Sequence, residues 1–319
     1  MSKNLVIVES PAKARTIGRF LGKSYIVKAS MGHVRDLPKS GLGIETSDRS
    51  FEPSYRVMPD KRKIITELKN AVKTADVVYL ATDPDREGEA ISWHLMEATG
   101  IPKEKARRVI FHEVTEAAVQ HAFENPRPLN VSLVNQQQAR RMMDRLIGYP
   151  LSDVVRRKIR NKLSAGRVQS VALKLITDRE KERNNFNSEE YWILETVFSK
   201  SSEHIDQTAF PAILHSIDGS TVRRSAKSKW KIAIDDESTA KQIPENLSNS
   251  EFLVSSCKTR PIKERPSAPF ITSTLQRSAS TKLGLNAQNT MRLAQQLYEG
   301  IEVNGSERVG LITYMRTDS

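Results

Sequence analysis

The sequence predicts an α/β protein that begins with a mainly parallel β-sheet, and three patterns in its N-terminal part lead to this prediction. Short apolar runs rich in β-branched residues, typical of buried strands, recur at 5–8, 25–29 and 77–81. Segments with the apolar spacing of helices separate these runs and cover 12–21, 61–72 and 88–98. A further strand is expected at 109–111. Strands that alternate with helices indicate a parallel sheet covered on both faces, with ligands at the carboxyl ends of its strands.

The remaining chain divides into a basic helical region, a β-rich segment and a second helical region. Helices are expected over 135–149 and 167–182, the second of which is expected to bury its apolar residues, namely Val168, Val171, Ala172, Leu175 and Ile176. Between 156 and 174 there are seven basic residues and no acidic one. The strand-like runs that follow are 191–198, 210–217 and 252–257. Beyond Pro266 the pattern is helical again.

Length and charge limit the classes of protein. At about 150 residues per domain, 319 residues indicate roughly two domains with a sizeable core. The chain has 50 Lys and Arg against 38 Asp and Glu, and this net charge of +12 favours a polyanionic partner, with nucleic acid ahead of an anionic membrane surface. An apolar fraction of 38% with 28% charged residues excludes a fibrous protein or a disordered linker.

Cysteine usage and the N-terminus indicate a cytoplasmic protein. Cys257 is the only cysteine, so the chain forms no internal disulfide and no cysteine cluster for zinc. The first apolar run ends at Glu9 and is too short for a signal peptide or a membrane-spanning helix. We therefore expect no membrane association.

An acidic motif directly follows the predicted strand at 77–81. It places Asp83, Asp85 and Glu87 at alternate positions before a helix. Because the carboxyl ends of neighbouring parallel strands lie side by side, Glu9 at the end of the first strand can share the same cleft. Hard oxygen ligands in this pattern suit Mg²⁺. The alternative is a solvated acidic turn that caps the next helix.

Clustered carboxylates repel one another, so we expect one of them to hold a proton at neutral pH and to serve as a general acid. Lys13 lies on the first turn of the following helix, either as a phosphate ligand in this cleft or as an ordinary surface lysine. Residues 18–24 resemble a nucleotide-binding loop with one residue too few between the glycines. We interpret them as a helix end with Gly22 as the C-cap, without an ATP site.

The basic helix at 135–149 has a polar face suited to single-stranded nucleic acid. Arg141 and Arg145 share a stripe beside Tyr149, and Arg140 and Asp144 are spaced as an i, i+4 ion pair. The alternative is a solvated helix face with a salt bridge. Two phosphate contacts are also expected at the N-terminal end of the next helix, from Arg167 and Gln169.

Near the end of the sequence, Tyr314 and Arg316 share a face if the segment is extended. A guanidinium group beside the phenol is expected to lower its pKa and to stabilise charge on a phosphate under attack. The alternative is a half-buried tyrosine that packs in a strand.

These motifs closely resemble those of the bacterial type IA DNA topoisomerases, and the resemblance covers nearly the whole chain. The matching stretches are LVIVESPAKA (5–14), MGHVRDLP (31–38), YLATDPDREGEAISWHL (79–95), NQQQARRMMDRLIGY (135–149), LSAGRVQSVAL (163–173), APFITSTLQ (268–276) and GLITYMRTDS (310–319). It implies a Toprim domain over 1–129, a basic helical DNA-binding region over 130–185, a β-rich arch segment over 186–262 and the start of a tyrosine-bearing domain over 263–319.

The resemblance also implies roles for individual residues. Tyr314 would attack DNA and take a 5′ phosphate, and Glu9 would protonate the leaving 3′ oxygen. Lys13 and Arg316 would hold the scissile phosphate. Glu9, Asp83, Asp85 and Glu87 would form the Mg²⁺ group. The residues that would line the single strand are Arg140, Arg141, Asp144, Arg145, Tyr149, Arg167 and Gln169.

The implied activity is relaxation of negatively supercoiled DNA without ATP, by a monomer in the cytoplasm and nucleoid. Family chains continue well past the tyrosine motif, so the sequence is expected to be an N-terminal fragment with an incomplete arch and tyrosine domain. Residues 301–309 resemble a local insertion of unknown role. Two alternatives stay open: a DNA-binding fragment that cannot cleave DNA, and a Toprim nuclease or primase. Neither alternative would form a 5′ phosphotyrosyl adduct.

Overall fold

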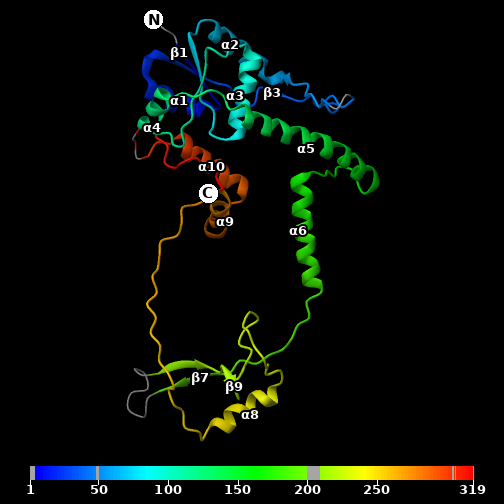
Figure 1. The fold of residues 1–319 in the computed structure, drawn as a ribbon, viewed down its shortest axis with the longest axis vertical. Helices are drawn as coiled ribbons and strands as arrows, with labels where there is room; N and C mark the ends of the chain where they lie inside the picture. The colour runs from blue at the N-terminus through cyan, green and yellow to red at the C-terminus, as the bar shows by residue number, and fades with distance from the viewer. Residues whose placement is uncertain (1–3, 48–49, 200–208, 304, 306, 319) are drawn as a thin grey trace. The chain divides into compact units, whose positions relative to one another are not determined.

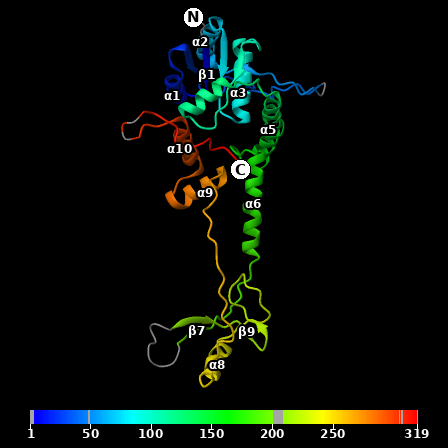
Figure 2. The same ribbon diagram turned by 60° about the vertical axis from the view of Figure 1, so that its left-hand side comes forward.

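The structure is a computed structural model that describes residues 4–47, 50–199, 209–303, 305 and 307–318. The chain forms two compact units, described separately here (Figures 1 and 2). Unit 1 comprises Met1–Val171 and Pro266–Ser319, and unit 2 comprises Ala172–Arg265. Among the described residues no helix combines the length and apolar character needed to cross a membrane.

The main sheet of unit 1 is parallel, as predicted. Its strands are β1 (Asn4–Val8), β2 (Tyr25–Ala29), β5 (Val77–Leu80) and β6 (Ala106–Arg108). They follow the order β2-β1-β5-β6, and every neighbouring pair is parallel. The fourth strand was expected at 109–111, which is wrong by three residues. The chain leaves the ladder after Val109, whose N–H still donates to the carbonyl of Leu80, and Phe111 enters the core.

Helices cover both faces of this sheet. Their bounds are α1 (Pro11–Leu21), α2 (Arg62–Lys73), α3 (Arg86–Thr99) and α4 (Glu116–Glu124). Val6 and Val8 belong to a core cluster shared with α1 and α4, whereas Leu5 and Ile7 belong to a cluster shared with α2 and α3. Successive side chains of a strand point to opposite faces, so β1 supplies both cores. A short antiparallel pair, β3 (Arg35–Asp36) and β4 (Arg56–Val57), lies outside the sheet.

The two helices beside the strand ends begin within two residues of their predicted starts. Ser10 caps α1, Pro11 occupies its first turn, and Gly22 ends it with φ 69°, which confirms the predicted C-cap. Asp85 caps α3, its carboxylate accepting from the N–H of Gly88. A Cβ atom on Gly88 would lie 2.1 Å from the carbonyl oxygen of Asp83, so only glycine fits this turn.

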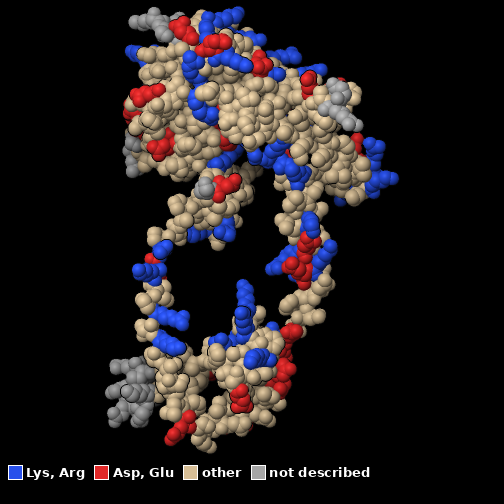
Figure 3. Space-filling view, in the orientation of Figure 1, with Lys and Arg blue, Asp and Glu red and all other residues tan. Residues whose placement is uncertain are grey.

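The basic region consists of α5 (Val131–Lys158) and α6 (Arg167–Asn184). Helix α5 is longer than predicted because it continues through Pro150 to a basic last turn, where Lys and Arg side chains gather (Figure 3). The prediction that α6 buries its apolar residues is wrong. Leu175 and Ile176 are 67% and 68% exposed, since no described residue of the chain covers that face.

The tyrosine segment returns to unit 1 after α9 (Thr272–Leu283) and α10 (Ala287–Glu299), which confirms the predicted helical ending. Backbone N–H groups of Gly310 and Tyr314 donate to the carbonyls of Val114 and His112. A Cβ atom on Gly310 would lie 2.6 Å from the carbonyl oxygen of Tyr298, so the close approach requires glycine. These bonds hold the segment against the loop between β6 and α4.

Unit 2 is small and β-rich. It contains the antiparallel pair β7 (Glu195–Phe198) and β8 (Phe210–Ile213), the pair β9 (Ser216–Ile217) and β10 (Ser220–Thr221), and helix α8 (Glu237–Leu247). Val222, Ile234 and Ala240 form its buried core. The strand expected at 252–257 is absent from this described segment, whose apolar side chains are exposed, Leu253 by 89%.

Candidate active site

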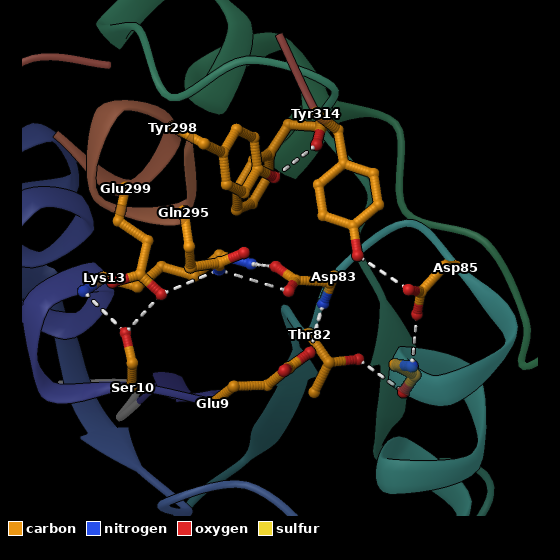
Figure 4. A network of polar contacts seen from close by, with 12 residues as sticks. Glu9, Ser10, Lys13, Thr82, Asp83, Asp85, Gln295, Tyr298, Glu299 and Tyr314 are labelled. Atoms are coloured by element: carbon orange, nitrogen blue, oxygen red, sulfur yellow. Dashed lines mark hydrogen bonds and ion pairs between the residues drawn. The ribbon is translucent and has the colours of Figure 1, made fainter. Parts of the chain in front are cut away.

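Three segments that are far apart in the sequence meet at the carboxyl end of the parallel sheet (Figure 4). Glu9 follows β1, Asp83 and Asp85 follow β5, and Tyr314 comes from the segment after α10. The strand ends therefore bring the predicted acidic residues to one edge of the sheet. The backbone hydrogen bonds of the tyrosine segment place the Tyr314 phenol at the same edge.

Lys13 is buried in this cleft, so the surface-lysine alternative is wrong. Its side chain is 0% exposed, and its Nζ lies 2.8 Å from Asp83 Oδ1. The ammonium group also lies over the rings of Phe111 and Tyr298, at 4.8 and 5.7 Å from their centroids. A buried cation with one carboxylate partner leaves donors for an anion.

Glu9 fits the expectation that one carboxyl of the cluster holds a proton near neutral pH. Its Oε1 accepts the backbone N–H of Asp83 at 2.5 Å. Burial and the Asp83 charge together raise the pKa of Glu9 to about 7, against the opposing effect of Lys13. Glu9 can therefore exchange a proton close to pH 7.

This raised pKa predicts the effect of Glu9→Gln on stability. The pKa of Glu9 in the folded protein lies above the unfolded value of 4.5. The contribution of Glu9 to the stability of the wild type is therefore fully present below about pH 4.5 and is lost as pH rises through 7. Glutamine cannot ionise, so without Mg²⁺ the variant should match the wild type at pH 4. It should be more stable by roughly 3 kcal/mol at pH 8. Urea denaturation at both pH values, in chelator, measures the difference. A pH-independent difference would contradict the assigned burial of a charge at Glu9.

The Tyr314 hydroxyl and the Arg316 guanidinium meet on one carboxylate oxygen. The hydroxyl donates to Asp85 Oδ2 at 2.6 Å, and Arg316 Nη1 lies 3.4 Å from the same oxygen. Burial raises the pKa of Tyr314 well above its ordinary value, and the charges of Asp83 and Asp85 add to this. The prediction that this pKa is lowered is wrong. Arg316 does act to lower it, but burial and the charges of the two carboxylates outweigh Arg316.

The acidic residues supply carboxylate oxygens, which are ligands that suit Mg²⁺. Asp85 and Glu87 carry partly exposed carboxylates, and Glu87 accepts from Gln137 Nε2 at 3.1 Å and lies 3.5 Å from His33 Nε2. No group of three or more His, Cys, Asp or Glu side chains in the described chain converges as a metal cage. Such a cage is not required, since Mg²⁺ commonly takes one or two carboxylates and completes its shell with water and phosphate oxygens.

Sequence reasoning missed a polar network that joins α1 to α10. Glu299 Oε1 accepts from Ser10 Oγ at 2.8 Å and from Gln295 Nε2 at 3.0 Å. Tyr298 packs its ring edge-on against Tyr314, with centroids 5.2 Å apart, and its hydroxyl donates to the carbonyl of Phe111. Nearly 290 residues separate the partners Ser10 and Glu299, so no local pattern could indicate the contact.

Arg108 was also missed, although it supports the acidic loop from below. Its side chain is 0% exposed, and Nε lies 2.9 Å from Glu89 Oε2. Its other nitrogens donate to the carbonyls of Thr82 at 2.9 Å and Asp83 at 2.7 Å. One buried guanidinium thus fixes the backbone that presents Asp83.

The two arginines of the predicted DNA-binding stripe on α5 have different environments in the structure. Arg141 is partly exposed and donates twice to Asp36, at 3.0 and 2.7 Å. Arg145 is only 2% exposed, donates to the carbonyl of Pro38 at 2.8 Å and stacks 4.2 Å from the Tyr149 ring centroid.

The predicted pair between Arg140 and Asp144 is wrong. Asp144 instead accepts two bonds from Arg167, at 2.9 and 3.0 Å, because the turn after α5 returns α6 to its side. Tyr149, Arg167 and Gln169 line a surface pocket of about 480 Å³ between the two helices.

This difference in environment predicts different effects for two neighbouring arginines. Arg145→Ala should lower the free energy of unfolding by about 2 kcal/mol, because a buried donor and its stacking contact are lost. Arg141→Ala should cost little stability. If Arg141 contacts phosphate, its loss should reduce the slope of log affinity against log salt by about 0.7 for single-stranded DNA. Arg157, exposed on the same helix and paired with Asp153, is the matched control. An unchanged slope for Arg141→Ala would reject the phosphate contact.

The segment interpreted as an insertion folds back onto α1. Ile301 and Val309 form an antiparallel bridge, and Arg19 of α1 donates to the carbonyl of Arg308. Thr16 also donates to the carbonyl of Glu299 at 3.0 Å. These contacts lie between five and fifteen residues before Tyr314 and help to hold its segment on the first helix.

Comparisons with known proteins agree with this arrangement. A family model described as "DNA topoisomerase" matches residues 128–319, and a Toprim domain matches residues 4–114. The fold and site therefore define a DNA topoisomerase with an N-terminal Toprim domain, and the chain belongs to the type IA DNA topoisomerase family.

Individual relatives extend the match to the whole chain. It is 48% identical over 320 residues to DNA topoisomerase 1 of Campylobacter jejuni, covering 100% of this chain and 43% of that protein. It also matches the structure of full-length topoisomerase I from Thermotoga maritima, with TM-score 0.81 and 40% identity over 99% of this chain and 49% of that one. The chain thus spans about half the length of these relatives.

Proposed function

We propose that the chain carries the cleavage centre of a type IA topoisomerase, which relaxes negatively supercoiled DNA through transient single-strand breaks without ATP. The observation that supports this proposal most directly is the position of the Tyr314 hydroxyl. It lies 2.6 Å from Asp85 Oδ2, in the cleft that also holds Lys13 and Glu9. A nucleophile, a carboxyl with pKa about 7 and a buried cation are the groups that phosphoryl transfer to a phenol requires.

The residues would divide the reaction as follows. The Tyr314 oxygen attacks the scissile phosphorus, forms a bond to the 5′ phosphate and displaces the 3′ oxygen, to which Glu9 gives its proton. Asp85 is placed to accept the phenol proton. Lys13 and Arg316 hold the phosphate oxygens and stabilise the charge that develops on them. The reverse steps reseal the strand, and the phosphotyrosyl bond conserves the energy that ATP would otherwise supply.

Asp83, Asp85, Glu87 and Glu9 are the residues we propose to hold Mg²⁺. When bound, the ion would offset the negative charge of the acidic cleft and of the incoming phosphates. The charges of Asp83 and Asp85, which add to the effect of burial on the pKa of Glu9, support this assignment, because a divalent cation would offset them.

The DNA partner would be a single-stranded segment of underwound duplex. We propose contacts along α5 and the start of α6, from Arg140, Arg141, Asp144, Arg145, Tyr149, Arg167 and Gln169. We further propose that the protein acts as a monomer at the nucleoid, with domain boundaries near residues 129, 185 and 262.

A covalent trapping experiment tests this function. The chain is incubated with 3′-labelled single-stranded DNA and Mg²⁺ without nucleotide, then denatured. A labelled DNA–protein adduct on a tyrosine supports the proposal. Free cleaved DNA with no adduct would favour a Toprim nuclease, and binding without cleavage would favour a DNA-binding role alone.

A further inference from the structure

A cavity of about 340 Å³ opens in unit 1 between β3, α3 and α5. It contains a concentration of unpartnered polar groups. Among the described residues, four buried side-chain atoms that line it have no hydrogen-bond partner, namely Arg35 Nη1, Tyr55 OH, His94 Nδ1 and Gln137 Oε1. Buried polar atoms are nearly always paired, either with protein or with ordered water, so four unpartnered atoms around one cavity mark a place suited to a polar ligand.

Two of these groups are too enclosed to be satisfied by bulk solvent. His94 is 2% exposed and Gln137 is 7% exposed. The Gln137 amide has a fixed orientation because its Nε2 donates to Glu87, so Oε1 faces the cavity as an acceptor. A ligand must therefore bring a donor to Gln137 as well as acceptors for Arg35.

A phosphodiester alone does not match all the unpartnered groups of the cavity. Burial lowers the pKa of His94 to about 3, so its imidazole is neutral at pH 7. Arg141 is paired with Asp36. A phosphodiester of DNA could bind Arg35, but it has no proton to give Gln137 Oε1 at neutral pH.

Aromatic rings and a guanidinium group form part of the cavity wall. The Tyr55 and His94 rings meet edge-on with centroids 4.6 Å apart, and Arg35 lies over the face of Tyr55 at 5.7 Å. A planar heterocycle with ring nitrogens, carbonyl oxygens and an amino group matches the donor–acceptor pattern of the unpartnered atoms. Unstacked nucleobases have this chemistry and are recognised in this way.

We propose that this cavity receives one unstacked base of the single strand and recognises its hydrogen-bonding edge. The inference rests on the proposed function, since it takes the ligand to be single-stranded DNA. Tyr55, His94 and Gln137 become specificity-determining residues, separate from the stack of Arg145 on Tyr149. Arg140 and Arg141 at the same cavity would hold the flanking phosphates.

Tyr55→Phe provides the test, because it removes only the unpartnered hydroxyl. Affinity is measured for a mixed-sequence single strand and for an abasic strand of equal length and charge. The ratio of the two affinities isolates the contribution of the bases. Tyr55→Phe should reduce this ratio about tenfold, the equivalent of one buried hydrogen bond. The melting temperature should stay equal or rise, since an unpaired buried hydroxyl is removed.

Controls separate the possible failures. Tyr191→Phe makes the same change in unit 2 and should leave the ratio of the two affinities unchanged.

An unchanged ratio in Tyr55→Phe would overturn the inference while the proposed function stands. Loss of affinity for both strands equally would also overturn it, because the hydroxyl would then act on the backbone. No binding of either strand by the wild type would overturn the proposed function itself. Competition by a free mononucleotide, lost in Tyr55→Phe, would assign the cavity to free nucleotides instead.

Discussion

Tyr314→Phe is expected to abolish the covalent DNA adduct while single-stranded DNA affinity changes less than about twofold. The substitution removes the attacking oxygen and preserves the ring, which packs edge-on against Tyr298. Loss of a sole nucleophile typically costs at least about 10⁴-fold in rate, so the adduct should fall below detection. Denaturing gels with 3′-labelled single-stranded DNA and Mg²⁺ measure the adduct, and fluorescence anisotropy measures binding.

Tyr298→Phe is the matched control. It removes a hydroxyl that donates to the carbonyl of Phe111, in the same cluster and on the neighbouring ring. It should cost about 1 kcal/mol of stability and retain the adduct. An adduct that survives Tyr314→Phe, or that disappears in Tyr298→Phe with the fold intact, would remove Tyr314 from the role of nucleophile.

The sequence predicted the sheet well because the signals involved are local. Buried runs such as 5–8 and 77–80 sit between helical patterns, and alternate side chains of β1 reach opposite cores. The cap residue Gly22 acts through its own backbone neighbours, and it was found where expected. The convergence of Glu9 with Asp83 follows from the rule that parallel strands end at one edge.

The predictions that failed depend on what packs against a residue. The Arg140–Asp144 pair was expected from helical spacing, but Arg167 from another helix takes Asp144. Arg145 follows the same stripe as Arg141, yet the loop at 38–41 covers it. The pKa of Tyr314 was expected to fall beside Arg316, but burial reverses the sign. Spacing along one helix or strand does not contain such information.

Arg108 shows how packing decides the environment of a residue that local sequence signals do not single out. It stands in a run of two arginines, and nothing in that run distinguishes it from its neighbour Arg107, which is exposed. Only the pairing of β6 with β5 turns Arg108 inward, where Glu89 and the carbonyls of the acidic loop receive it. The acidic motif therefore depends on a residue about twenty positions away for its geometry.

Arg108→Ala is expected to lower the free energy of unfolding by about 3–5 kcal/mol, because it leaves several buried carbonyls without a donor and removes the buried cation beside Glu89, which keeps only Arg127 and the N–H of Asn130. Arg107→Ala should stay within about 0.5 kcal/mol, since the Arg107 side chain donates only to nearby carbonyls of Glu104 and Ala106. Urea denaturation compares the two. The double variant Arg108→Met with Glu89→Leu should recover part of the loss, because the buried Glu89 carboxylate is removed together with its buried cation, whereas the carbonyls that Arg108 satisfies stay without a donor. If that variant regains stability but not the Mg²⁺-dependent adduct, Arg108 positions the acidic loop for cleavage, and equal losses for Arg107→Ala and Arg108→Ala would contradict this role.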